Sequence, residues 1–234
     1  MKSIFYISAL LLLSTAAVAQ KEGNLNNRFG IKVGDNNSVL STSLNKSSGS
    51  KEGLCLGGYY QLRLKHNMAL LLELSFNQLR CMNSGKVQFI VSSNQGDIVQ
   101  QRTTLYLDYL SLPLTYKLYT GKAFNFQLGA YGAFLLNANQ KGTLSTTTLY
   151  TNNYATFLGT QTQSENRNAT SSVYRADAGL SGGIGYDFPF GLNFTLKYFE
   201  SLVNIDQSFK TLTGKPLHNQ YIQFTAGYSF GCKN

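Results

Sequence analysis

Hydrophobic and polar residues alternate along eight stretches of this chain. In each stretch, apolar side chains take every second position, and small or polar side chains take the positions between them. This is the period of a β-strand with two different faces. The predicted strands are Arg28 to Gly34, Leu54 to Leu64, Met68 to Arg80, Tyr106 to Tyr119, Phe124 to Asn137, Arg175 to Phe188, Leu192 to Val203 and Asn219 to Phe230.

The connections between these strands alternate strictly between tight turns and long polar loops. The turns are Lys65 to Asn67, Thr120 to Ala123 and Pro189 to Gly191, and the loops are Asp35 to Gly53, Cys81 to Leu105, Ala138 to Tyr174 and Asn204 to His218. The alternation places all loops at one end and both termini at the other. It predicts an all-β fold, an eight-stranded antiparallel up-and-down transmembrane β-barrel of the outer membrane, with periplasmic termini and extracellular loops.

The N-terminus supports this location. Lys2 is a short positive region, Ile4 to Leu13 is an apolar region, and Ala17 to Ala19 is an A-x-A cleavage site before Gln20. This pattern predicts a secretory signal peptide, because the apolar stretch is shorter than the roughly 20 residues of a spanning helix. The predicted domains are a signal peptide (1–19), a periplasmic segment (20–27), the outer-membrane barrel (28–230) and a C-terminal tail (231–234).

Composition agrees with a barrel in lipid. Charged residues make up 13% of the chain, and Tyr and Phe contribute 15 each, whereas soluble domains carry about 25% charge. Without Lys2, 19 basic and 11 acidic residues give a net charge of +8, but the basic residues form no stripe, which argues against nucleic acid. We expect aromatic girdles at the rims. The candidates are Tyr60, Tyr106, Tyr116, Phe124, Phe126, Phe188, Phe194, Tyr198, Tyr228 and Phe230.

Several segments carry a family resemblance: YLSLPLTYKLY at 109–119, FQLGAYGAFLLNA at 126–138, the glycine-rich 178–205 and QFTAGYSF at 223–230. On these residues the chain resembles the PorT-like outer-membrane β-barrel family of Bacteroidota-type bacteria. The resemblance implies a small barrel in the outer membrane and little about activity, since most members of the family have no assigned activity. The founding member is associated with secretion of proteins across the outer membrane. The chain departs from the usual terminal aromatic of such barrels, because four residues follow Phe230.

The inward face of the predicted barrel carries charges. Eight strands enclose an interior that side chains fill, and charges there need partners. We therefore predict a polar network of ion pairs that plugs the barrel. Its members are Lys32, Arg63, Glu73, Lys117, Asp177 and Lys197.

Hairpin geometry refines this prediction. A three-residue turn at Lys65 to Asn67 sets Tyr59 opposite Glu73, and a turn at Pro189 to Gly191 sets Lys197 opposite Gly183. The small glycine leaves room for the lysine to cross the lumen, with Asp177 or Glu73 as its partner.

The same register sets Cys55 opposite Asn77, which places Cys81 too far away for a disulfide. We expect free thiols at Cys55, Cys81 and Cys232, of which Cys232 is the most exposed. No Cys or His spacing indicates a metal site, and no cofactor is predicted.

The predicted function is that of a non-enzymatic outer-membrane barrel whose loops make structural, surface-binding or secretion-related contacts. The expected partners are outer-membrane lipids, lipopolysaccharide and proteins bound by the loops. Val87 to Val91 is β-prone, so its hairpin should extend beyond the membrane and present a sheet edge to a partner strand, or simply continue the wall. The alternatives are a small porin-like channel, a lipid A-modifying enzyme using His218 beside Asp206 and Ser208, and a soluble periplasmic barrel.

Overall fold

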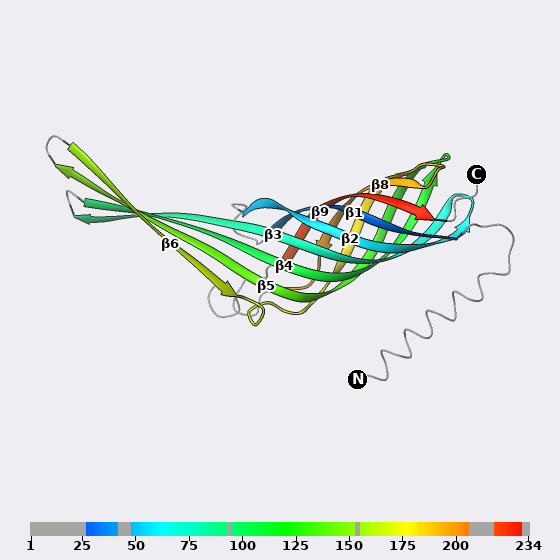
Figure 1. The fold of residues 1–234 in the computed structure, drawn as a ribbon, viewed down its shortest axis with the longest axis horizontal. Coiled ribbons are helices and arrows are strands. Elements are labelled where there is room, and N and C mark those ends of the chain that lie inside the picture. The colour runs from blue at the N-terminus through cyan, green and yellow to red at the C-terminus, as the bar shows by residue number, and fades with distance from the viewer. Residues whose placement is uncertain (1–26, 42–47, 93–94, 153–154, 206–217, 231–234) are drawn as a thin grey trace.

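The described part of the chain consists of long antiparallel strands. The computed structural model describes residues 27–41, 48–92, 95–152, 155–205 and 218–230 (Figure 1). Among these residues, no helix is both long enough and apolar enough to span a bilayer. The strands within these ranges are β1 (Arg28–Ser41), β2 (Ser48–Lys65), β3 (Met68–Ser92), β4 (Gln95–Thr120), β5 (Phe124–Asn152), β6 (Ala155–Asn168), β7 (Ala176–Asp187), β8 (Leu192–Ser201) and β9 (His218–Phe230).

Eight of the nine described strands close into a ring. Each strand pairs antiparallel with its neighbour, from β1 through β5 and then through β7, β8 and β9. The pairing of β1 with β9, which begins with Phe29 opposite Phe230, joins the last strand to the first. The ring therefore has no open edge, and the predicted eight-stranded up-and-down barrel is confirmed. The pairing also places the start of β1 and the end of β9 at the same end of the barrel.

The sequence analysis underestimated the lengths of β3, β4 and β5. The predicted loops Cys81 to Leu105 and Ala138 to Tyr174 are wrong in large part, because the strands continue through them. The expected extension of the Val87 hairpin is confirmed, with Val87 opposite Val99. Most of these extensions are polar on both faces. The hydrophobic alternation that reveals a half-buried strand is therefore absent from them.

The extensions form a four-stranded arm. Its strands are the outer halves of β3, β4 and β5, together with β6, which pairs only with β5 among the described strands. Figure 1 shows the arm leaving the barrel at the end opposite to the start of β1 and the end of β9. The first predicted loop is also shorter than expected, because β1 continues to Ser41 and β2 begins at Ser48. The fourth agrees with the structure to within two residues, since β8 ends at Ser201 and β9 begins at His218.

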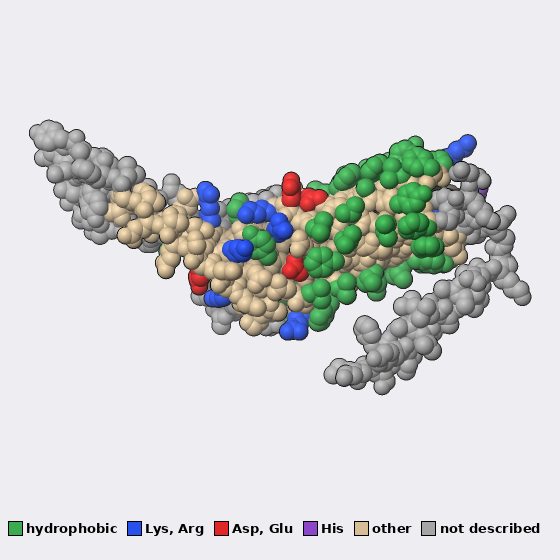
Figure 2. Space-filling view, in the orientation of Figure 1, with side chains coloured by type: hydrophobic (Ala, Val, Ile, Leu, Met, Phe, Trp, Pro, Cys, Tyr) green, Lys and Arg blue, Asp and Glu red, His purple; other side chains and the backbone are tan. Residues whose placement is uncertain are grey.

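A band of apolar side chains surrounds the barrel wall. On β4 the outward residues Leu110, Leu112 and Leu114 are 42–49% exposed, while Ser111 and Pro113 between them are buried. Figure 2 shows the band on the barrel and its absence from the described part of the arm. The alternation predicted from the sequence is therefore an alternation between the outside of the wall and its interior.

Two of the three tight turns use glycine for a left-handed backbone. Gly121 has φ of 80° and Gly191 has φ of 101°, values that residues with a Cβ adopt rarely. The turn predicted at Lys65 to Asn67 is one residue shorter, because Lys65 already pairs with Met68. A register shift between Arg63 and Lys65 compensates, so that Tyr59 still lies opposite Glu73.

We predict that Leu114→Arg destabilises the barrel by about 2–4 kcal/mol, the usual cost of a cation on the lipid face near the bilayer centre. Leu114 is the middle residue of the apolar series on β4. The matched control is Gln161→Arg on the exposed face of β6, with an expected change within about 0.5 kcal/mol. Urea unfolding of the protein refolded in lipid vesicles measures both. Equal effects of the two substitutions would contradict a lipid-facing band.

Candidate functional site

The interior of the barrel holds a cluster of three charged side chains. Glu73 on β3 lies between two lysines, with Lys32 Nζ 3.1 Å from its Oε1 and Lys197 Nζ 2.8 Å from its Oε2. All three side chains are at most 4% exposed. Lys197 also donates a hydrogen bond to Thr115 Oγ1 over 3.3 Å. Strands β1, β3, β4 and β8 are thereby joined through the lumen.

The glycine opposite Lys197 makes this arrangement possible. Gly183 pairs with Lys197 in the β7 and β8 register. A Cβ at Gly183 would lie 2.3 Å from the carbonyl oxygen of Leu196 and 2.9 Å from Cγ of Lys197. The absent side chain therefore leaves the volume that the lysine stem occupies. The structure pairs Lys197 with Glu73, one of the two partners that the sequence left open.

A second charged group lies nearer to the end where the chain termini enter and leave the barrel. Lys117 Nζ is 3.3 Å from Oδ2 of Asp187, and the hydroxyl of Tyr119 donates to the same oxygen over 2.6 Å. Arg63 does not join this cluster by an ion pair among the described residues; its guanidinium lies 4.2 Å from the centre of the Tyr119 ring. Asp187 was not among the predicted network residues, although it shares the inward face of its strand with Asp177.

Asp177 lies apart from the lysines. Its carboxylate accepts hydrogen bonds from Ser201 Oγ at 2.5 Å and Asn219 Nδ2 at 2.9 Å, and from the Tyr131 hydroxyl at 3.5 Å. Along β7, Asp177 is six residues from Gly183, the residue opposite Lys197, and six residues of strand span about 20 Å. This distance along the strand explains why Lys197 meets Glu73 and not Asp177.

Uncharged polar side chains fill the levels between the charged groups. Gln223 Nε2 donates to Asn36 Oδ1 and to Asn77 Oδ1, each over 2.9 Å. Asn193 Nδ2 donates to the Tyr59 hydroxyl over 2.7 Å, and this hydroxyl is 2.7 Å from Ser229 Oγ. These contacts connect residues from opposite ends of the sequence, so the lumen is crossed by hydrogen bonds at several heights.

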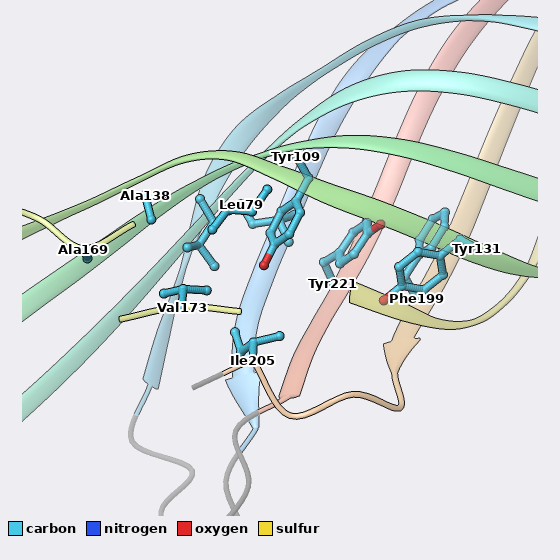
Figure 3. Packing of buried hydrophobic residues seen from close by; sticks show 11 residues of the cluster. Leu79, Tyr109, Tyr131, Ala138, Ala169, Val173, Phe199, Ile205 and Tyr221 are labelled. Carbon is cyan, nitrogen blue, oxygen red and sulfur yellow. The ribbon is translucent and has the colours of Figure 1, made fainter. Parts of the chain in front are cut away.

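An apolar cap lies at the arm end of the lumen. Val173, from the segment between β6 and β7, and Ile205, from the segment after β8, pack into a cluster with Leu79 and Tyr109 (Figure 3). The backbone amide of Tyr174 donates to the carbonyl of Ile205 over 2.8 Å, which ties the two segments together. The sequence analysis missed this cap. Isolated apolar residues in the otherwise polar predicted loops were the available signal.

Three aromatic rings complete the cap. Phe199 stacks on Tyr221 with ring centres 4.5 Å apart and meets Tyr131 edge to face at 5.4 Å. Figure 3 shows these three rings next to one another. Together with Val173 and Ile205 they place an apolar layer above the polar levels of the lumen.

The arm presents two strand edges. Outside the ring, β3 pairs with β2 only as far as Asn83, and β6 pairs only with β5 among the described residues. Hydroxyl side chains line one face between β5 and β6: Ser145 Oγ lies 3.4 Å from Thr162 Oγ1, and Thr147 Oγ1 lies 3.3 Å from Thr160 Oγ1. Such an edge offers unpaired backbone groups to an incoming strand.

The described cysteines are free and buried. Cys55 is fully buried and Cys81 is 2% exposed. Burial raises the pKa of the Cys81 thiol, which lies beyond the apolar band, to about 12. Cys232 lies outside the described residues. Neither buried thiol is therefore placed for reaction.

The two histidines lie at opposite ends of the barrel. His66 is exposed in the turn between β2 and β3, and His218 begins β9 opposite Ser41. Asp206 and Ser208, the residues considered as catalytic partners of His218, lie outside the described residues. Among the described residues, no three His, Cys, Asp or Glu side chains are grouped so that they could hold a metal ion.

Similar folds occur among solved outer-membrane proteins. Ail, the attachment invasion locus protein of Yersinia pestis, has a TM-score of 0.44 and 12% identity, over 88% of this chain and 100% of that one. Neisserial surface protein A has a TM-score of 0.41 and 11% identity, over 89% and 100%. The N-terminal β-barrel domain of Pseudomonas aeruginosa OprF has a TM-score of 0.35 and 11% identity, over 88% and 100%. At these identities the likeness is one of fold alone.

No curated protein matches the chain significantly. A family model does match: the model described as outer membrane protein beta-barrel domain covers residues 18–207, which is most of the chain. The closed ring and the apolar band agree with this match. The chain belongs to the outer membrane protein beta-barrel domain family and is an outer-membrane β-barrel protein.

Proposed function

We propose that this protein is a plugged, non-enzymatic barrel that holds a rigid four-stranded arm outside the cell as a contact surface for a protein partner. The observation that carries the proposal is the arm itself. Strands β3, β4 and β5 run without interruption from the apolar band into it, apart from single-residue shifts of register. The barrel therefore fixes the direction of the arm.

The filled lumen supports a structural role for the barrel. Its charges are matched by partners on other strands, as Glu73 is by Lys32 and Lys197, and the apolar cluster around Val173 and Ile205 covers the arm end. Side chains that pair with one another across the lumen occupy the space that ions would need. This arrangement favours a plugged barrel over the porin-like alternative.

The arm supports a role in binding. Its exposed β6 carries Thr, Gln, Ser and Asn and lacks a continuous apolar surface, so it is suited to polar contacts and to strand addition along its edge. The orientation of the arm toward the outside follows from the short turns at the other end of the barrel.

The finer family assignment remains a prediction. The resemblance to the PorT-like barrels rests on the residue patterns of 109–119 and 126–138. It suggests that the protein partner of the proposed function belongs to a secretion or assembly system. A contact with the secretion machinery would then use the same arm or the turns at the other end. Lipids and lipopolysaccharide remain the expected partners of the barrel wall.

We predict that Glu73→Gln lowers the free energy of unfolding by about 3–5 kcal/mol, because it leaves two buried ammonium groups without a counter-charge. The control is Glu165→Gln on the exposed face of β6, with an expected change within about 0.5 kcal/mol. A triple variant, Lys32→Met with Glu73→Leu and Lys197→Met, should regain most of the loss. Urea unfolding in vesicles measures all three. Unchanged stability of Glu73→Gln would indicate a hydrated lumen instead of a plugged one.

We expect the refolded full chain to give no discrete conductance steps in planar bilayers. The hydrogen-bonded levels from Lys117 to Gln223 and the apolar cap close the path. A large porin inserted in the same membranes is the positive control. Regular single-channel steps of the folded protein would replace the plugged barrel with the small-channel alternative.

Site-specific photo-crosslinking in living cells tests the arm. A photoreactive residue at Gln161 on β6 should give protein adducts, whereas one at His66 in the opposite turn should not. A variant that replaces 84–102 and 143–164 with Asn-Gly turns should fold, judged by its resistance to SDS without heating. Cells that carry only this variant should show the same phenotype as cells that lack the protein. Adducts confined to position 66 would assign a periplasmic assembly role and overturn the proposal.

A further inference from the structure

The outward face at the base of the arm carries a pair of cations on one aromatic ring. The guanidinium of Arg80 on β3 lies 5.7 Å from the centre of the Tyr106 ring, and Lys141 Nζ on β5 lies 5.3 Å from the same centre. Tyr106 on β4 stands between them, since it pairs with Arg80 on one side and with Asn139 on the other. The tyrosine was expected in an aromatic girdle, but the structure surrounds it with positive charge.

These cations lack an acidic partner in the described part of the chain. No salt bridge there involves Arg80 or Lys141, and Arg80 uses Nη2 to donate to Gln78 Oε1 over 3.2 Å. The carboxylate of Asp108 lines the same cavity as the two cations. It accepts a hydrogen bond from Asn137 Nδ2 over 3.3 Å and forms no salt bridge with Arg80 or Lys141. Arg80 and Lys141 line the same cavity, so an anion bound in it would be attracted by both charges.

The surface is hollowed at this point. A cavity of about 300 Å³ opens between β3, β4, β5 and β6. This volume is enough for a phosphate group and part of a sugar attached to it. Beside the two cations, Tyr106 and Asp108, its walls carry amide side chains, which donate hydrogen bonds to phosphate and hydroxyl oxygens. The amides are Gln78, Asn139 and Asn166.

The depth of the cavity matches that of a lipid headgroup. Arg80 is four residues beyond Phe76, and Tyr106 is four residues beyond Leu110, the residues at which the regular apolar series on the outer faces of β3 and β4 end. Four residues of a tilted strand rise about 10 Å along the membrane normal. Headgroups occupy roughly the first 5–8 Å outside the hydrocarbon, within reach of the long arginine and lysine side chains. Figure 2 shows Lys and Arg side chains gathered on the arm side of the hydrophobic band.

We propose that Arg80, Tyr106 and Lys141 form a binding site for the phosphate of a lipopolysaccharide molecule in the outer leaflet. The guanidinium binds two phosphate oxygens, the ammonium binds a third, and the ring keeps both cations in place. The amides contact the adjoining sugar. Lipid bound here packs its acyl chains on the apolar outer face of β3, β4 and β5 and braces the base of the arm.

Native mass spectrometry of the full chain in detergent tests this site, with purified lipid A as the probe. Arg80→Gln combined with Lys141→Gln should weaken binding of lipid A at least about tenfold, the loss expected for two charge-assisted contacts. The matched control is Arg28→Gln with Lys122→Gln, which removes two positive charges at the other end of the barrel and should leave the affinity unchanged. Far-ultraviolet circular dichroism verifies that both variants fold.

Two further probes distinguish the phosphate of lipid A from other anions that the site could bind. Dephosphorylated lipid A should bind the wild type as weakly as phosphorylated lipid A binds the double variant. Equal binding of the two lipids to the wild type, or an equal loss in the control variant, would overturn the proposal. Displacement of lipid A by a soluble acidic polysaccharide at lower concentration would overturn it in favour of an extracellular ligand. Because the shortened-arm variant keeps Arg80, Tyr106 and Lys141, this test and that of the proposed function fail independently.

Discussion

The whole structure depends on the fact that hydrocarbon offers no hydrogen-bond partner to a backbone amide. A sheet inside a bilayer must therefore close on itself, and the pairing of β1 with β9 provides that closure. Closure fixes the two faces of every strand, one toward lipid and one toward the lumen. The apolar band and the polar interior are two consequences of the same requirement.

A lumen of eight strands is narrow, and this narrowness makes its charges interdependent. Each buried lysine needs an acid at its own height, and each acid needs donors on several strands. Glu73 meets this condition with Lys32 and Lys197, and Asp187 meets it with Lys117 and Tyr119. The ion pair of Lys197 also depends on packing, because the lysine stem occupies the space that a side chain at position 183 would fill.

The constraint ends where the strands leave the bilayer. Water satisfies open backbone groups there, so β3 and β6 are free to end a sheet without closing it. The same strands that are obliged to form a ring in lipid form an open, twisted arm outside it. The base of the arm, with its cations beside Tyr106, marks the height of this change.

The sequence by itself determined the ring of strands and the inward position of Lys32, Glu73, Lys117, Asp177 and Lys197, because side chains two residues apart on a strand share a face. Only the tertiary structure decided which of them meet. Lys197 and Glu73 are 124 residues apart in the chain, and their contact depends on the stagger of a closed barrel. The same reason hid the apolar cap, whose residues come from segments with no regular period. Apart from the Val87 hairpin, the arm was not predicted, because polar strands carry no hydrophobic pattern and their pairing is visible only once neighbouring strands are aligned.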